Sequence, residues 1–193
     1  MDDGVHFVVF DSALGELALA WRGDGARGLC GSQLPAADGA ALRALMLQRF
    51  PGAQELTPDR APAMVAQARQ AIQRLLAGAT ADHRELLAIP LDDSAVPAFE
   101  RQVLALTREI PVGHTRSYGE LALALGEPGA ARAVGRAEGH NPFAPIVPCH
   151  RVLGAGGAPT GFSAPGGVET KRRLLLIEAR AAGQLTGDQQ SLF

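Results

Sequence analysis

The stretch IVPCHRV, residues 146–152, is the part of the chain around which the rest is organised. It places Cys149 between Pro148 and His150, with Arg151 next along the chain. A thiol reacts as a thiolate, and free cysteine titrates above neutral pH, so a reactive cysteine needs a nearby base or positive charge. His150 can take the proton, directly or through a water, and Arg151 adds positive charge. The alternative is a buried structural cysteine beside an incidental histidine.

Pro148 indicates how the thiol is presented. Proline fixes its own φ and biases the residue before it toward extended geometry. We therefore expect the chain to leave a buried strand at Val147 and to present Cys149 at a turn. A Cys-His pair alone does not decide between a reactive and a structural cysteine, so the flanking residues carry the argument.

Length and cysteine content narrow the class of protein. With 193 residues, the chain can form one large domain or two small ones with their own cores. No apolar run reaches the ~18 residues of a membrane span and no basic-then-apolar leader is seen, so we expect a cytoplasmic protein without a membrane part. The two cysteines, Cys30 and Cys149, fit a reducing compartment and supply too few thiols for structural zinc.

Charge is divided unevenly along the chain. The net charge is −2. Residues 1–94 hold eight Arg and twelve Asp or Glu, a balance of −4, whereas residues 95–180 hold nine Arg, one Lys and seven Glu, a balance of +3. The basic excess lies with Cys149, which indicates a modest phosphate-binding face on the second half only. Lys171 is the one lysine, which we interpret mainly as a composition bias.

The first half has the pattern of a small mixed domain. Three short strands separated by glycine-containing turns predict an antiparallel meander, followed by two helices and a further strand. These segments are expected at residues 5–10, 17–21, 26–30, 38–49, 61–77 and 86–91. We place a first domain at 1–92, a second at 94–182 and a polar tail at 183–193. Cys30 is expected to be a small buried hydrophobe.

The second half is predicted to be helical. Phe99, Val103, Leu106 and Ile110 fall at i, i+4, i+7 and i+11, so they line one face of a core helix that Pro111 ends. The sequence SYGE, residues 117–120, is a capping box that starts a short helix. A glycine-proline turn leads to a second short helix at 129–139. Two such helices form a helix-turn-helix arrangement.

That second helix is built from small residues and carries two arginines. Arg132 and Arg136 are four residues apart, so they project from one face. Small side chains allow a backbone to lie close to another surface. Taken alone, this pattern favours tight packing against a neighbouring helix.

The second half closely resembles the O6-alkylguanine-DNA alkyltransferases, also called methylated-DNA-protein-cysteine methyltransferases. The resemblance rests on the block NPFAPIVPCHRV, and it extends with order and spacing kept through further motifs on both sides. These motifs are IPVG at 110–113, SYG at 117–119, AARAVG at 130–135, GFS at 161–163, Leu174-Leu175 and Glu178. The resemblance implies an α+β fold, with a ribonuclease-H-like N-terminal domain of mainly structural role and a helical alkyltransferase domain.

The resemblance also assigns residue roles. Cys149 would accept the alkyl group, His150 would activate it, and Glu178 would accept a hydrogen bond from His150. Asn141 would tie the recognition helix to the active-site segment through backbone hydrogen bonds. Without the resemblance, the alternative for Glu178 is a solvated glutamate on an ordinary amphipathic helix.

Further family roles concern the substrate and DNA. Tyr118 would help to rotate the nucleotide and would donate to the flipped guanine; its alternative is a core tyrosine. Arg132 would fill the gap in the base stack, since base chemistry inside a duplex requires extrusion. The remaining expected contacts to guanine or to the DNA minor groove are Val152, Phe162, Ser163, Ala131 and Arg136.

The predicted chemistry is a direct alkyl transfer. The Cys149 thiolate attacks the alkyl carbon in line, and guanine leaves as an anion that Tyr118 can neutralise. The resulting thioether has no easy leaving route, so we expect a single turnover, no cofactor and no metal. O6-methylguanine is the expected substrate, with O4-methylthymine slower, and the protein is expected to be a monomer. The rival functions are a lesion sensor without transfer and a cysteine hydrolase with many turnovers.

Two positions depart from the family pattern. Phe162 stands where many members have tyrosine, which removes a hydroxyl beside the pocket. Glu138 stands at a pocket-lip position that is often apolar or small. A carboxylate near the alkyl group disfavours bulky apolar adducts, so the sequence predicts a preference for methyl over benzyl groups.

The tail lies outside this resemblance. The last five residues, QQSLF, begin at Gln189 and end at Phe193. They resemble short peptides with which bacterial replication and repair proteins bind the sliding clamp, where the final apolar pair fills a pocket. A frayed terminus is the alternative.

Overall fold

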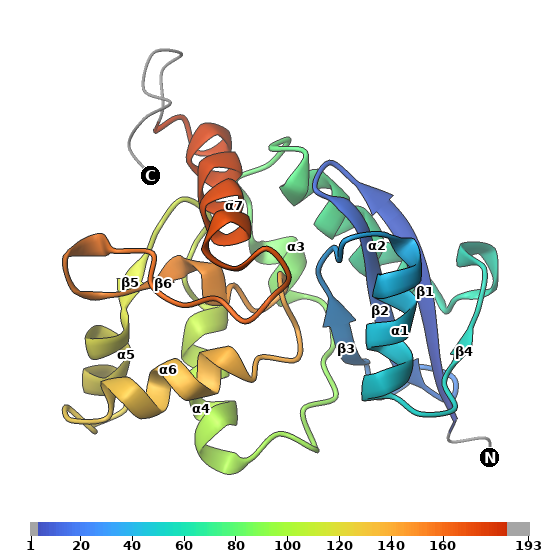
Figure 1. The fold of residues 1–193 in the computed structure, drawn as a ribbon, viewed down its shortest axis with the longest axis horizontal. Coiled ribbons are helices and arrows are strands. Elements are labelled where there is room, and N and C mark those ends of the chain that lie inside the picture. The colour runs from blue at the N-terminus through green and yellow to red at the C-terminus, as the bar shows by residue number, and fades with distance from the viewer. Residues whose placement is uncertain (1–3, 185–193) are drawn as a thin grey trace.

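The computed structural model describes residues 4–184, and the chain is a mixed α+β protein, as predicted (Figure 1). The first half combines a four-stranded sheet with helices, and the second half is mainly helical. The strands are β1 (Val5–Ser12), β2 (Gly15–Arg22), β3 (Leu29–Gln33), β4 (Gln54–Glu55), β5 (Arg116–Ser117) and β6 (Val152–Leu153). The α-helices are α1 (Gly39–Arg49), α2 (Ala63–Leu76), α3 (Arg84–Leu87), α4 (Ala98–Arg108), α5 (Tyr118–Ala124), α6 (Ala131–Gly139) and α7 (Gly167–Ala181). Short 3-10 helices are η1 (Pro58–Arg60), η2 (Cys149–Arg151) and η3 (Ala155–Gly157).

The sheet of the first half has the order β3-β2-β1-β4. The antiparallel pairs β1–β2 and β2–β3 confirm the predicted meander, and β4 adds a parallel partner to β1 that the sequence pattern did not indicate. The third strand begins at Leu29 rather than at residue 26. Gly28 has φ +95° and its Cβ position would collide with the Pro90 carbonyl, so the chain turns there before the strand can start.

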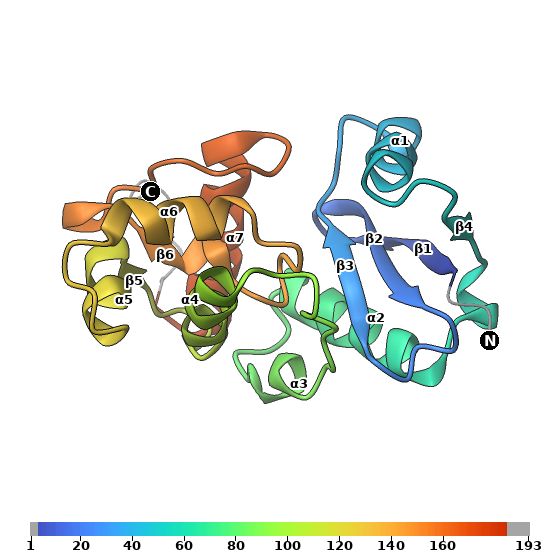
Figure 2. The same ribbon diagram turned by 90° about the horizontal axis from the view of Figure 1, so that it is seen from below.

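Helices cover both faces of this sheet, α1 on one side and α2 on the other (Figure 2). The Asp38 side chain caps α1 by accepting from the Ala41 N–H at 2.8 Å. From α1, Leu42 and Met46 pack against Phe7 of β1. From α2, an apolar stripe packs against the opposite face of the sheet and supplies the larger core. Both predicted helices of the first half are confirmed within two residues at each end.

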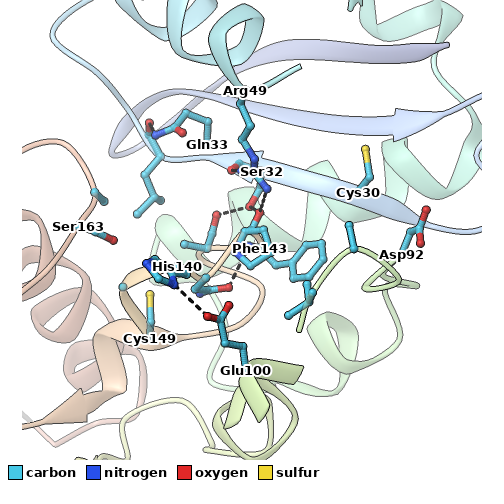
Figure 3. Close-up of a pocket in the computed structure, with 18 of the residues that line it drawn as sticks. Cys30, Ser32, Gln33, Arg49, Asp92, Glu100, His140, Phe143, Cys149 and Ser163 are labelled. Carbon is cyan, nitrogen blue, oxygen red and sulfur yellow. Dashed lines mark hydrogen bonds and ion pairs between the residues drawn. The ribbon is translucent and has the colours of Figure 1, made fainter. Parts of the chain in front are cut away.

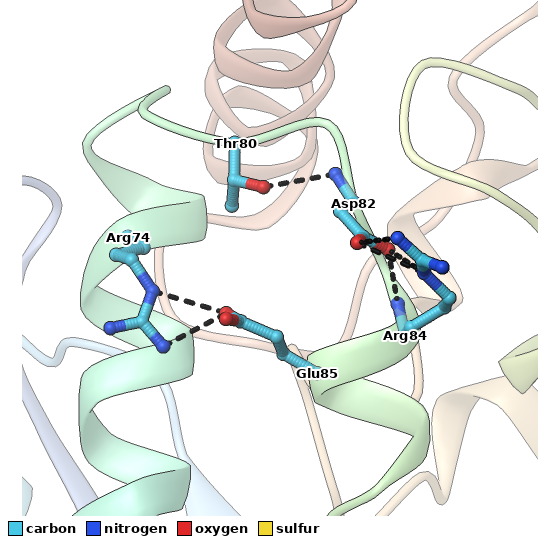
Figure 4. A network of polar contacts seen from close by, with 5 residues as sticks. All are labelled: Arg74, Thr80, Asp82, Arg84 and Glu85. Carbon is cyan, nitrogen blue, oxygen red and sulfur yellow. Dashed lines mark hydrogen bonds and ion pairs between the residues drawn. The ribbon is translucent and has the colours of Figure 1, made fainter.

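The strand predicted at residues 86–91 is wrong. Residues 84–87 form the short helix α3 instead, and just before it the Asp82 side chain makes an Asx turn by accepting from the Arg84 N–H at 2.9 Å (Figure 4). The Arg84 side chain returns to Asp82 at 2.6 Å, and Arg74 of α2 bonds to Glu85 at 2.9 Å. In place of a strand, the segment 86–91 has one isolated bridge, between Leu29 and Leu91.

The helices of the second half follow the predicted pattern. The capping box at the start of α5 is present: Glu120 N–H donates to Ser117 Oγ at 3.1 Å, and Ser117 N–H donates to the Glu120 carboxylate at 2.6 Å. Helices α4, α5 and α6 share one core, in which Val103, Leu121 and Val134 are fully buried. Helix α7 packs against η2 and against α2, so it joins the two halves of the molecule (Figure 1).

Candidate active site

Cys149 begins the 3-10 turn η2, at the end of a buried loop rather than of a strand. The expectation of a strand before it is wrong: residues 142–146 form successive turns, and the Val147 N–H donates to the Phe143 carbonyl at 2.9 Å. Cys149 N–H donates to the Val147 carbonyl at 2.9 Å, which tightens the turn around Pro148. The thiol residue is 5% exposed. The expected turn is therefore present, although it is reached from a loop.

His150, Arg151 and Glu178 form a buried ionic group. Glu178 Oε1 lies 2.8 Å from His150 Nε2, and both Arg151 Nε and Arg151 Nη2 donate to the carboxylate at 2.8 Å. Burial opposes ionisation of Glu178, but His150 and Arg151 outweigh it and bring its pKa to about 2. A carboxylate only accepts hydrogen bonds, so the proton of neutral His150 sits on Nε2. The hydrogen bond expected between these two residues is present.

The second ring nitrogen of His150 is left as a potential base. Nδ1 is buried and has no protein hydrogen-bond partner within residues 4–184. Burial lowers the pKa of His150, and Glu178 offsets this only in part. The imidazole is therefore neutral at physiological pH, and its Nδ1 lone pair is available to accept a proton.

The Cys149 thiol is neutral in the free protein. Burial, together with the nearby Glu138 carboxyl, raises the pKa of Cys149 to about 12, against smaller lowering effects of Asn141 and Lys171. The expectation that Arg151 supplies the positive charge is wrong, because its guanidinium is paired with Glu178 and donates to the Ile110 carbonyl at 2.5 Å. A thiolate can therefore form only when a base takes the proton.

Lys171 is the site residue that the sequence pattern missed. It is fully buried, and its Nζ donates to the Val152 carbonyl at 2.6 Å and to the Thr160 carbonyl at 3.3 Å. The ammonium also lies 5.7 Å from the ring centroid of Tyr118. Burial lowers the pKa of Lys171, while Cys149 and Glu138 raise it. Being the one lysine of the chain was a signal that could have pointed to a special position.

Asn141 holds the loop that leads to the thiol. Its Nδ2 donates to the Val147 carbonyl at 2.7 Å, and its Oδ1 accepts from the Phe143 N–H at 2.9 Å. These two bonds connect the end of α6 to the turn before Cys149, in line with the backbone hydrogen bonds expected for this residue.

The first half of the chain supports the same loop from the other side (Figure 3). Ser32 of β3 donates from its N–H to the Pro142 carbonyl at 2.9 Å and from Oγ to the Ala144 carbonyl at 2.6 Å. Arg49 at the end of α1 donates to the Ser32 and Pro142 carbonyls at 3.1 and 3.2 Å. The N-terminal sheet therefore helps to fix the active-site loop.

Two cavities meet at Cys149. The larger, of about 850 Å³, lies between β3 and the active-site loop, and Cys149 and Ser163 both line it (Figure 3). The smaller, of about 320 Å³, lies between α6, Cys149 and the loop that follows β6. Its lining consists of Tyr118, Gly135, Glu138, Gly139, Cys149, Gly161, Phe162 and Ser163. The thiol is thus buried, but it borders space in which a ligand fits.

The structure brings most predicted substrate contacts to these cavities. Tyr118 is half-buried and donates from its hydroxyl to the Thr160 carbonyl at 3.2 Å. Burial, with smaller effects of Glu138 and Cys149, raises its pKa, so the phenol keeps its proton. Phe162 and Ser163 line both cavities. The Val152 side chain is fully buried instead, and its carbonyl already accepts from Lys171.

The predicted DNA-contacting residues lie on α6. Arg132 and Arg136 are exposed, and within residues 4–184 neither guanidinium has an ion-pair partner. Ala131 is half-buried at the first position of the helix. Helix α6 packs against both α5 and α4 through Val134 and Ala137 on its other face. The expected packing and the expected projection of the arginines therefore occur on opposite sides of one helix.

Residues 4–184 contain neither a cluster of metal-ligand side chains nor a membrane-spanning helix. No three side chains of the His, Cys, Asp or Glu type gather there as possible metal ligands. No helix in this part of the chain is both long enough and apolar enough to cross a membrane.

A thiol at the floor of a cavity, beside a short helix with two exposed arginines, is the site arrangement of a protein with a cysteine nucleophile. A family model described as the DNA-binding domain of 6-O-methylguanine DNA methyltransferase matches residues 98–180. A methylated-DNA–protein-cysteine methyltransferase of Mycobacterium tuberculosis is 40% identical over 183 residues, which cover 94% of this chain and 98% of the relative. One from Salmonella typhimurium is 53% identical over 80 residues, covering 42% of this chain and 46% of the relative.

Solved structures give the same result. The Mycobacterium tuberculosis OGT in complex with DNA has a TM-score of 0.70 and 35% identity, covering 91% of this chain and 94% of that one. The O6-methylguanine-DNA methyltransferase of Pyrococcus kodakaraensis has a TM-score of 0.63 and 26% identity, covering 90% of this chain and 98% of that one. The chain belongs to the methylated-DNA–protein-cysteine methyltransferase family.

Proposed function

We propose that this protein repairs DNA by transferring the alkyl group of O6-alkylguanine to its own Cys149. The observation that carries the proposal is a buried thiol bordering a cavity of about 850 Å³, a volume typical of sites for small organic ligands. Family membership supports the reaction type, and the DNA complex of the Mycobacterium tuberculosis relative supports DNA as the partner.

The proposed reaction moves one proton and forms one bond. Nδ1 of His150 takes the thiol proton through a water, and Glu178 steadies the imidazolium that results. The sulfur then attacks the alkyl carbon as the bond between that carbon and O6 breaks, and the electron pair leaves with guanine. Tyr118 protonates the guanine anion and recovers a proton from His150. Atoms and charge balance without a cofactor.

Access to the alkyl group requires the nucleotide to leave the duplex. We propose that α6 enters the minor groove, with Ala131 against the backbone and Arg136 near the phosphates. The exposed, unpaired guanidinium of Arg132 supports its role as the side chain that replaces the extruded base. The basic balance of residues 95–180 agrees with contact between this half and DNA.

The reaction is proposed to occur once per molecule. The sulfur of a thioether is a poor leaving group, so water does not remove the alkyl group from it. O4-methylthymine is a slower substrate in this proposal, because it presents an alkylated oxygen on a smaller ring.

The division of the chain and the tail remain proposals. Residues 1–92 and 94–182 are proposed to act as a supporting domain and an alkyl-transfer domain, joined by the Ser32 and Arg49 contacts. The sliding-clamp peptide from Gln189 to Phe193 lies outside the described residues. Its test is retention on a clamp-coated surface with and without those five residues.

A stoichiometric DNA assay tests the function. A duplex with one O6-methylguanine is mixed with increasing protein, and the remaining lesion is measured after digestion to nucleosides. We expect one lesion lost per protein molecule and none lost with Cys149→Ser. Loss of many lesions per molecule identifies a hydrolase, and binding without loss identifies a lesion sensor; either result rejects the proposal.

A further inference from the structure

The smaller cavity contains a carboxyl group that the transfer reaction does not use. Glu138 sits in the last turn of α6, is 4% exposed, and lines this cavity of about 320 Å³ together with Cys149 and Tyr118. Its carboxyl interacts electrostatically with the Cys149 thiol, the Tyr118 phenol and the Lys171 ammonium. It is therefore placed among the groups that surround the reacting sulfur.

The two oxygens of Glu138 differ. Oε1 lies 2.5 Å from the Thr107 hydroxyl, whereas Oε2 is buried without a hydrogen-bond partner in the described part of the chain. The Thr107 hydroxyl also lies 3.0 Å from the Val103 carbonyl. One hydroxyl proton serves only one of these acceptors, so the short contact fits a Glu138 that is itself protonated. Burial raises its pKa to about 7, against lowering effects of Thr107 and Lys171.

An unpartnered buried oxygen favours ligands that can reach it with a donor. A buried acceptor without a hydrogen-bond partner carries a free-energy penalty. A ligand hydroxyl that donates to it removes this penalty, whereas an apolar group of the same size leaves it in place. Sites built around such a group discriminate by hydrogen bonding far more strongly than by one methylene of size. The alkyl group to be transferred must lie next to Cys149, which borders both cavities, and an alkyl group that enters the smaller one lies beside Glu138.

We infer that Glu138 is a specificity-determining residue that makes this protein prefer O6-alkylguanines with a short hydroxyl-bearing chain, such as 2-hydroxyethyl, over apolar chains of matching length. The inference rests on the proposed alkyl transfer to Cys149. In this proposal a small rotation of the Glu138 carboxyl turns the buried Oε2 toward the cavity, where the hydroxyl of the adduct donates to it, while Oε1 stays with Thr107. The preference predicted from sequence for methyl over benzyl has the same origin, because a benzyl ring covers Oε2 without a donor.

Rates of single-turnover transfer from three matched duplexes test the inference. The lesions are O6-methyl-, O6-propyl- and O6-(2-hydroxyethyl)guanine, and the readout is the ratio of the hydroxyethyl rate to the propyl rate on one protein preparation. Because both rates are measured on one preparation, the fraction of active protein cancels in this ratio. We expect a ratio of about ten in the unmodified protein, the value of one hydrogen bond, and a ratio near one in Glu138→Leu.

Two further variants complete the test. Glu138→Gln keeps an oxygen acceptor and is expected to keep a ratio above that of Glu138→Leu, whereas Glu109→Leu, at an exposed glutamate after α4, keeps the original ratio. A ratio near one in the unmodified protein, or an unchanged high ratio in Glu138→Leu, overturns the inference while the methyl rate still supports the proposed function. Absence of methyl transfer from every duplex rejects the proposed function itself.

Discussion

Replacing Glu178 with glutamine tests how the site is held together. The substitution preserves shape but removes the charge that pairs with Arg151 and His150, all within a fully buried group. Removing one partner of a buried ion pair typically costs roughly 3–5 kcal/mol, because the other charge stays buried. The pKa of Glu178, at about 2 against an ordinary 4.5, corresponds to a similar figure of about 3 kcal/mol. We expect Glu178→Gln to lower the free energy of unfolding by about that amount.

Thermal and urea unfolding measure this effect. For a chain of this length, about 3 kcal/mol lowers the melting temperature by roughly 6–12 °C, and the urea midpoint by roughly 1–2 M. The exposed Glu109 provides the matched control, since Glu109→Gln changes only a solvated side chain and is expected to stay within about 0.5 kcal/mol. A loss below about 1 kcal/mol in Glu178→Gln would refute the reasoning that this ionic group stabilises the site.

The effect of this substitution also depends on pH. Since the pKa of Glu178 is depressed in the folded protein, its stabilisation is present above pH 4.5 and is lost as pH falls toward 2. The difference in stability between the unmodified protein and Glu178→Gln should therefore shrink below pH 4.5. A difference that stays constant down to pH 3 contradicts the assigned cause.

The remaining predictions concern the thiol, the DNA contact and the loop. With Cys30 replaced by serine, labelling of Cys149 by iodoacetamide should rise about tenfold per pH unit from pH 7 to 9, because its pKa is about 12; a plateau in that range contradicts this. Lys171→Met should slow the labelling at every pH, since the cation that favours the thiolate is gone, and faster labelling contradicts it. Arg132→Ala should slow transfer from duplex DNA roughly 10- to 100-fold more than transfer from free benzylguanine; equal effects contradict an intercalating role. Ser32→Ala removes the Oγ bond to the Ala144 carbonyl of the active-site loop and should cost about 1–3 kcal/mol in urea unfolding, because that carbonyl loses its donor; an unchanged midpoint contradicts this.

Local sequence signals predicted most of the fold. The capping box at Ser117 and the apolar period that includes Val103 on α4 involve residues close together in the chain. Both could therefore be predicted from the sequence pattern alone. The strand predicted at residues 86–91 failed because the Asx turn at Asp82 leads into the short helix α3, whereas the prediction rested on the apolar run alone. The strand expected before Cys149 failed because Asn141 binds the backbone at Val147 and folds the segment into turns.

The electrostatics of the site could not be predicted in the same way. Arg151 follows Cys149 by two residues in the sequence. In the structure, however, its guanidinium is paired with Glu178, which is 27 residues further along the chain. Lys171 comes to the thiol only because α7 packs against η2. The state of the thiol depends on these distant groups and on burial, so the sequence pattern could not show that Cys149 is a neutral thiol in the free protein.

The fate of the Cys149 sulfur is the most direct test of the central proposal. The protein is incubated with a duplex that carries one O6-methylguanine labelled in its methyl group, digested, and mapped by mass spectrometry. We predict one labelled methyl group on the peptide that contains Cys149, in equal amount to the guanine restored. Restored guanine with an unlabelled Cys149 would contradict the account.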